Sequence, residues 1–414
     1  MKGSNSGPIR IMEKKVAHMG KKLLALLFSL LLAFSFPGCG AKEENPTEAP
    51  ETEPESLKEI ADRNGTIIGR IDSRANATAS DAGIFYSVFA PGENQFTADA
   101  EYRFFRMEDG KDFRLGTLHD QGYEAFYART ELGGIMYALA VAGNPMDDKN
   151  DPLWLLAFDP MKETMSRYLV TENGFPYVAM TSFNGKILLM NHEQSEKGGD
   201  VIYEFDPGTQ KVCEVLSFDG KNDSLRSLYG AEEGLYVLRL DLRDSQTHEL
   251  CLDLYDRSYK PVSSLKLNEM LTKAALGVHG ITTPGDAQNE FGMLVSGFAV
   301  REGRYLYYEN FALLRTVVNL ETGEVLFAQD DYYSMSHGSG ERVFHRINFA
   351  EEGKEEIEIL FFHGGEVTPA TFTPPDSRTL LRQVSVSPGG TWALELSEGS
   401  PRDGGTPLIC LWKE

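Results

Sequence analysis

Short runs of alternating apolar and polar residues recur along the chain, separated by tight polar turns. One element is repeated, a strand followed by a polar turn, usually with an acidic residue, and a second strand. An Asp at the start of a turn accepts a hydrogen bond from the backbone two residues on, and Pro or Gly suits the φ values that follow. The pattern predicts β-hairpins, because helical periodicity is scarce. These hairpins are expected over residues 102–118, 153–169, 201–216, 251–267, 316–329 and 356–372.

Another strand with its own turn precedes most of the hairpins, as in GGIMYALAVAG and EEGLYVLRLD. Each unit therefore supplies about four strands in about 45 residues, the period of a propeller blade. A single four-stranded sheet cannot cover both of its apolar faces, whereas a ring of sheets packs face to face and leaves few exposed edges. The chain is predicted to be all-β and to fold as a β-propeller.

The last unit, residues 380–414, contains only three expected strands. Its SVSPGGTWALEL resembles the S-P-D-G-x-W element of several propeller families, with Gly389 in place of Asp. It also resembles an Asp-box, with Ser387 in place of the acid. An unpaired strand, GTIIGRI at 65–71, lies at the front of the repeats. Propellers commonly close by placing an N-terminal strand in the last blade, so we expect seven four-stranded blades closed in this way, with six or eight as alternatives.

Residues 264–277 depart from the strand pattern. Their apolar positions have helical spacing, and Gly277 suits a C-cap. With the residues that follow, they form an insertion between the fourth and fifth units. Insertions in repeat proteins often decorate the binding face, so 268–290 is one candidate contact region. The alternative is a helix that covers the edge of a blade.

The N-terminus has the features of an export signal. Four lysines between residues 14 and 22 precede an apolar stretch at 23–36. At 1.5 Å per residue this stretch is too short to span a bilayer core. A basic region, a short apolar region and small residues at the end identify residues 1–38 as a signal peptide, which plays no part in the fold.

The sequence FPGC at the end of this signal resembles the lipobox of bacterial lipoproteins. The resemblance implies that Cys39 is lipidated and anchors the exported protein to the outer face of the bacterial cell membrane. Phe36 and Pro37 depart from the usual pattern, and the alternative is an ordinary secretory signal cut elsewhere. Residues 39–61, rich in Glu and Pro, are expected to form a disordered tether that holds the propeller domain, 62–414, away from the membrane.

The net charge excludes some partners. The whole chain carries −22; residues 1–38 contribute six basic and one acidic residue, +5, so the chain from Cys39 carries −27. Nucleic acid and anionic lipid surfaces need basic patches, and we expect neither as a partner of the folded domain. Cys213, Cys251 and Cys410 lie far apart in the sequence, which excludes a disulfide-rich scaffold. We expect the three cysteines to be small buried residues on strands.

Catalytic motifs are absent from the sequence. It has no G-x-S-x-G elbow, no H-E-x-x-H and no P-loop, and the GSG within residues 337–343 is expected to be a loop. No pair of histidines has a ligand spacing, and the carboxylates are too numerous to select an acid/base pair. No cofactor is predicted.

Two loops offer candidate sites. Asp147, Asp148 and Asp151 supply oxygen ligands of the kind that Ca²⁺ prefers, although their spacing is not that of an EF-hand and a solvated acidic loop is the alternative. Tyr332, Tyr333 and His337 could stack on and hydrogen-bond to a sugar or peptide; the alternative is a strand edge that packs the tyrosines.

These observations favour a surface-anchored lipoprotein whose non-catalytic propeller binds a glycan, a peptide or an envelope protein. Two alternatives remain open: an extracellular hydrolase or lyase acting on glycans, and a scaffold for envelope assembly. The second rests on analogy at the level of the fold. Buried carboxylates converging on the centre of the ring would favour the enzyme, and a flat apolar patch on the rim would favour the scaffold.

Overall fold

The computed structural model describes strands from residue 60 to residue 413. The described residues are 60–61, 66–72, 77–88, 101–117, 125–141, 151–174, 179–193, 199–244, 248–276, 278, 295–310, 314–329, 333–338, 340, 342–346, 357–372, 380–397 and 408–413. Within these ranges the strands form seven antiparallel sheets, six of four strands and one of five. The chain is a β-propeller.

Each four-stranded sheet is one blade built from consecutive strands. Blade 1 has β3 (Thr78–Ser80), β4 (Gly83–Val88), β5 (Glu101–Arg106) and β6 (Lys111–Thr117). Blade 2 has β7 (Ala125–Leu132), β8 (Ile135–Val141), β9 (Asp151–Asp159) and β10 (Thr164–Gly174). Blade 3 has β11 (Met180–Phe183), β12 (Lys186–Glu193), β13 (Gly199–Asp206) and β14 (Lys211–Asp219).

The second half of the ring repeats this order. Blade 4 has β15 (Asp223–Gly230), β16 (Leu235–Asp241), β17 (Glu249–Tyr255) and β18 (Pro261–Lys266). Blade 5 has β19 (Val295–Arg301), β20 (Tyr305–Asn310), β21 (Arg315–Asn319) and β22 (Val325–Gln329). Blade 6 has β23 (Tyr333–Met335), β24 (Phe344–Arg346), β25 (Ile357–His363) and β26 (Glu366–Phe372). In each of these six blades, the last two strands are the hairpin predicted from the alternating pattern.

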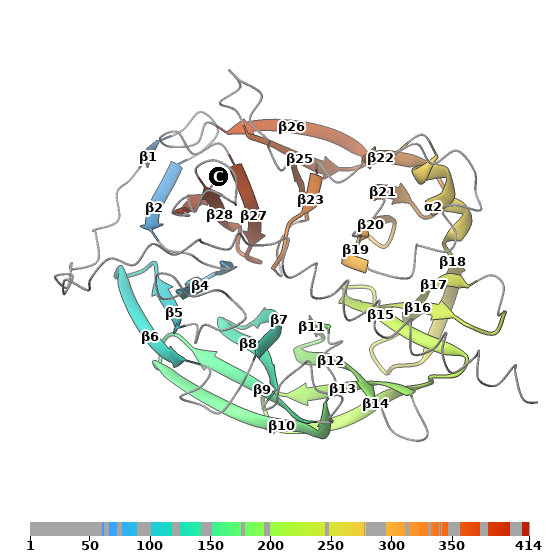
Figure 1. Cartoon of the computed structure of the whole chain (residues 1–414), viewed down its shortest axis with the longest axis horizontal. Coiled ribbons are helices and arrows are strands. Elements are labelled where there is room, and N and C mark those ends of the chain that lie inside the picture. Colours follow the sequence, from blue (N-terminus) through green and yellow to red (C-terminus); the bar gives the residue numbers. More distant parts are fainter. Residues whose placement is uncertain are drawn as a thin grey trace, which may run out of the picture.

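The first strand of each blade lies next to the centre of the ring and the last lies on the rim (Figure 1). Along the ring, β11 contacts β7 and β15, β15 contacts β19, and β27 contacts β3. The blades pack through apolar side chains. The rings of Phe104 in blade 1 and Phe158 in blade 2 are 5.3 Å apart, and those of Phe361 in blade 6 and Trp392 in blade 7 are 5.4 Å apart. Each blade thus covers the face that its neighbour cannot cover alone.

Blade 7 closes the ring with strands from both ends of the chain. It has β27 (Leu380–Val386), β28 (Thr391–Ser397), β29 (Leu408–Lys413), β2 (Thr66–Asp72) and β1 (Ile60–Ala61), in that spatial order. Ile67 pairs with Trp412 and Ile71 with Ile409, so the predicted closure by the N-terminal strand is confirmed. The seventh sheet has five strands instead of the expected four, because β1 adds to the outside of β2.

The β27–β28 turn contains the degenerate S-P-G-G element. The Gly389 N–H donates to Oδ1 of Asp81, a residue of the β3–β4 turn in blade 1, at 2.6 Å. A Cβ on Gly389 would lie 2.7 Å from the same oxygen. Asp81 of blade 1 therefore occupies the space that a side chain at position 389 would need.

The predicted helix is confirmed as α2 (Asn268–Ala275), but residues 264–266 of the expected range belong to strand β18, and Gly277 lies outside the described residues. Its apolar side, with Leu271, Ala274 and Ala275, joins the core shared by blades 4 and 5, and the helix contacts β21 and β22. This part of the insertion therefore covers a blade edge. No helix in the described residues is long and apolar enough to cross a membrane.

Candidate functional site

Side chains from blades that are not neighbours can meet only near the axis of the ring, and several cationic groups meet there. Arg342, in blade 6 just before β24, places its guanidinium carbon 5.9 Å from the ring centre of Tyr229 on β15 in blade 4. Between these blades, Arg301 at the end of β19 donates from Nη2 to the carbonyl oxygen of Gly340 at 2.5 Å. We call Arg301, Arg342 and His337 the axial cationic cluster.

The segment that carries this cluster is held against blade 7. The His337 N–H donates to the Val384 carbonyl and the Gly340 N–H to the Val386 carbonyl, both at 2.8 Å. A Cβ on Gly340 would lie only 2.1 Å from the carbonyl oxygen of Ser387, so only glycine allows this approach. His337 and Gly340, within the expected loop over 337–343, are therefore held in place by backbone hydrogen bonds to β27.

His337 is accessible to solvent, although protein surrounds it closely. Desolvation, followed by the charges of Arg342 and of Arg129 on β7, lowers its pKa to about 4. Arg129 belongs to blade 2, so its influence on a blade 6 residue places both near the axis. At neutral pH the imidazole is uncharged, and a neutral imidazole both donates and accepts hydrogen bonds.

Two buried carboxylates lie near the same axis. Glu131 on β7 accepts hydrogen bonds from the Asp81 N–H, at 3.1 and 3.3 Å, and burial raises its pKa to about 7. Burial also raises the pKa of Glu395 on β28 to about 7, against the opposing charge of Arg382. They are 4% and 3% exposed. Burial therefore favours the neutral form of both carboxyl groups.

His345 on β24 lies deeper, with 1% of its surface exposed. Desolvation, followed by the charge of His337, lowers its pKa to about 3. The charged form of this ring is therefore strongly disfavoured in the folded protein.

The pH dependence of stability should report on His345. Its folded pKa lies below the ordinary 6.5, so the unfolded chain takes up a proton below pH 6.5 while the folded chain does not. Stability is then lost as the pH falls towards 3. Between pH 7 and pH 4.5 the loss from this residue should be about 2–3 kcal/mol. Urea unfolding at both pH values should show that His345→Phe removes this loss.

The exposed His248 provides the control, because His248→Gln should retain the pH dependence of the wild type. Glu131 and Glu395 are present in the wild type and in both variants. Their opposite contribution to the pH dependence of stability therefore cancels when these proteins are compared. An unchanged pH dependence in His345→Phe would contradict the assignment.

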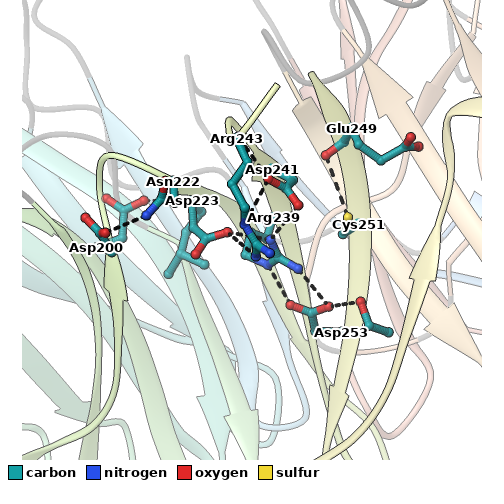
Figure 2. Close-up of polar contacts among 12 residues, drawn as sticks. Asp200, Asn222, Asp223, Arg239, Asp241, Arg243, Glu249, Cys251 and Asp253 are labelled. Carbon is teal, nitrogen blue, oxygen red and sulfur yellow. Dashed lines mark hydrogen bonds and ion pairs between the residues drawn. The ribbon is translucent and has the colours of Figure 1, made fainter. Parts of the chain in front are cut away.

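A second polar cluster lies within blade 4 (Figure 2). Arg239 on β16 donates from Nε to Asp253 Oδ2 at 2.7 Å and from Nη1 to Asp223 Oδ1 at 2.5 Å. Burial disfavours the charge on Arg239, but the hydrogen bond and charge of Asp253 outweigh burial and raise its pKa. The exposed Arg243 adds pairs at 3.6 Å to Asp223 and 3.3 Å to Asp241. The carboxylates of this cluster are paired with arginines of the same blade. The cluster therefore stabilises the blade and offers no open site.

The predicted tyrosine site is only partly described. Tyr332 lies outside the described residues. The Tyr333 hydroxyl donates to Glu358 Oε2 at 2.8 Å, and its ring packs edge-on against Phe327 at 5.5 Å between centroids. His337 instead lies near Arg129 and Arg342. The binding role of these residues remains a prediction.

The predicted calcium loop cannot be followed. Asp147 and Asp148 lie outside the described residues, and Asp151 is described only as the first residue of β9. Among the described residues, no group of three or more His, Cys, Asp or Glu side chains could hold a metal ion. Cys213 is exposed and Cys251 buried, both as free thiols on strands.

Sequence reasoning missed the arginines of the axis. The signal that would have found them is an arginine in the first strand of several repeats or in the connection from that strand to the second, once the repeats are aligned. These are Arg129 on β7, Arg226 on β15, Arg301 on β19, Arg342 before β24 and Arg382 on β27. Because first strands line the axis of a propeller, their charges accumulate there.

No family model and no curated protein matches the chain. Among solved structures it is similar to a prolyl endopeptidase, at 12% identity and a TM-score of 0.48, over 80% of this chain and 46% of that one. It is also similar to the β-propeller domain of the Trilobed protease from Pyrococcus furiosus, at 14% identity and a TM-score of 0.41, over 67% of this chain and 78% of that one. The chain spans less than half the length of the endopeptidase, and neither similarity bears on activity.

Proposed function

We propose that this protein is a lipid-tethered receptor whose propeller binds a ligand at its axis without chemically changing it. The observation that carries the proposal is the axial cationic cluster, which gathers basic side chains in a protein with a net charge of −22. Ligand sites lie preferentially in concave regions where a few polar groups converge. The inner ends of the blades provide such convergence.

The export signal and Cys39 support the location. A lipid on Cys39 would anchor the chain to the outer face of the membrane, and the Glu- and Pro-rich residues 39–59 would hold the propeller above it. The expected tether over 39–61 ends two residues earlier, because Ile60 and Ala61 form β1. Acidic residues on the tether and on the domain disfavour close contact with anionic lipid. The arrangement suits capture of a ligand from outside the cell.

The alternative function, a hydrolase or lyase acting on glycans, has less support than the receptor. Its candidate carboxylates are Glu131 and Glu395, which are buried as the enzyme alternative expects, but exposed fractions of 4% and 3% leave a substrate almost no access to them. Glu131 is also occupied by the backbone N–H of Asp81. A catalytic acid must reach its substrate, so these residues are better explained as supports of the inner strands.

The assembly scaffold also lacks a supporting surface. The exposed large apolar residues of the described chain are scattered over several blades and α2: Met161, Leu169, Val262, Leu276 and Val367. Isolated apolar residues are normal on a soluble surface, whereas a docking face needs a contiguous patch.

The tether is tested by Cys39→Ser. We expect this change to move the protein from the membrane fraction into the medium, or to leave it unprocessed, and the wild type to show an acylated N-terminus by mass spectrometry. A wild-type N-terminus that is free and lies downstream of residue 39 would contradict lipidation.

Binding without turnover is tested on the full-length protein purified in detergent. Panels of glycans, peptides and small organic acids should reveal saturable binding with no change in the ligand. If the protein converts a ligand, and Glu395→Gln or Glu131→Gln abolishes this turnover, the protein is an enzyme and the receptor proposal is wrong.

A further inference from the structure

We propose that the axial cationic cluster is a binding site for a small ligand bearing a carboxylate, sulfate or phosphate group, with Arg301 and Arg342 as its recognition residues and His337 as a hydrogen-bonding partner. This inference rests on the proposed receptor function and gives the chemical class of its ligand.

Among the described residues, no carboxylate forms an ion pair with Arg301 or Arg342. In the described residues, the polar contacts of Arg342 are the Ser336 carbonyl, which accepts from Nη1 at 2.8 Å, and the face of Tyr229. Its Nε is buried without a hydrogen-bond partner. Arg301 likewise donates a hydrogen bond to a backbone carbonyl, that of Gly340. A desolvated guanidinium without a carboxylate is costly, and a bound anion would remove that cost.

The cations also act on one another. Burial, followed by the charge of Arg301, lowers the pKa of Arg342, so these guanidinium groups lie close enough to repel each other. Arg342 and Arg129 disfavour a proton on His337 in the same way. Like charges brought together by a rigid fold create a local positive potential, although the chain as a whole is acidic.

The guanidinium groups are fixed in advance. Backbone carbonyls of residues 336 and 340 hold both arginines, and those residues are held in turn by hydrogen bonds to Val343 and Val386. Little side-chain entropy remains to be lost on binding. A guanidinium offers paired donors that match a carboxylate or a tetrahedral oxyanion, which a lysine does not.

The acidic surface limits what can reach the site. A long polyanion would be repelled by the acidic chain over its whole length, whereas a small anion needs only the local positive potential of the axial cationic cluster. Nucleic acid is therefore not the ligand that this arrangement favours.

The test measures binding of citrate, sulfate, phosphate and a uronate oligosaccharide to the full-length protein in detergent. Ionic strength is held constant with sodium chloride. We expect at least one of these anions to bind saturably by calorimetry and to raise the melting temperature. Arg342→Met and Arg301→Met should each weaken that binding at least tenfold, and Arg342→Lys should restore it only in part. Preference for the uronate would identify a sugar acid as the source of the anionic group, and preference for sulfate or phosphate would identify a free oxyanion.

The matched control is Arg304→Met. Arg304 lies three residues from Arg301, but it is exposed and paired with Glu321 at 2.5 Å, so its loss should leave binding unchanged. Without anion, Arg342→Met should melt at or above the wild-type temperature, because it removes a repulsive charge; this also shows that the variant is folded.

Three outcomes would overturn the inference. One is an equal stabilisation by anions in the wild type and in both arginine variants, which is the general effect of excluded salts. Another is the absence of saturable binding of every anion. The third is binding of a neutral glycan or peptide that is unaffected by Arg342→Met, which would leave the receptor function standing. Turnover of a bound anion would instead overturn the receptor function and leave the anion site intact.

Discussion

Deletion of residues 60–72 is expected to lower the melting temperature by about 10 °C or more. The deletion removes β1 and β2, and with them the pairing from Ile67–Trp412 to Ile71–Ile409 that joins the two ends of the chain. Blade 7 would keep only β27, β28 and β29. The outer side of β29 would become a long free edge, which invites pairing with other chains.

Calorimetry and light scattering of the purified protein measure both effects. The matched control is deletion of residues 43–55, a segment of the same length in the Glu- and Pro-rich tether, which should leave the melting temperature unchanged. If the two deletions melt within about 2 °C of each other, closure by β2 contributes little to stability.

Arg239→Met is expected to lower the free energy of unfolding by about 3–5 kcal/mol. Asp253 and Asp223 would remain in the interior of blade 4 without the guanidinium that pairs with them at 2.7 and 2.5 Å. The side chain of Asp253 is 9% exposed, so water cannot replace the lost partner. Breaking a buried ion pair on one side costs more than the pair contributes, because it leaves an uncompensated charge.

Urea denaturation tests this change against Arg243→Met. Arg243 pairs with Asp223 and Asp241, but its side chain is 63% exposed, and its loss should cost less than about 1 kcal/mol. Adding Asp223→Asn and Asp253→Asn to Arg239→Met should restore part of the stability by removing the stranded charges. Equal costs for the two single arginine changes would show that the network is solvated.

Most of the fold could be predicted because its signals are local. The outer hairpins have strict alternation and turns in which an Asp accepts backbone hydrogen bonds; Asp206, for example, accepts from the Gly208 N–H at 2.8 Å. The strand at 66–72 could be assigned to blade 7 because the last unit was one strand short. β1 could not be predicted, because Ile60 and Ala61 are too short a run to show any periodicity.

The candidate site was less predictable because it depends on contacts between distant units. An arginine such as Arg342, in the connection before β24, looks solvated in sequence, and only closure of the ring brings it to Tyr229 two blades away. His337 was selected for its tyrosine neighbours in sequence, whereas the structure places Arg342 and Arg129 near it. The ion pairs of Arg239 could not be predicted either. Alternation assigns Asp223 and Asp253 to polar positions of their strands, whereas the structure places them inside the blade.

The pairing of β2 with β29 also sets the order in which the chain can mature. β2 is the first long strand to leave the ribosome and the export channel, and its partner is the last, so it waits for nearly the whole chain to emerge. The equilibrium cost of joining such distant segments grows only with the logarithm of their separation, but long-range pairing is slow. A chain that ends before residue 408 lacks β29, so β2 would also lack the strand that joins it to blade 7.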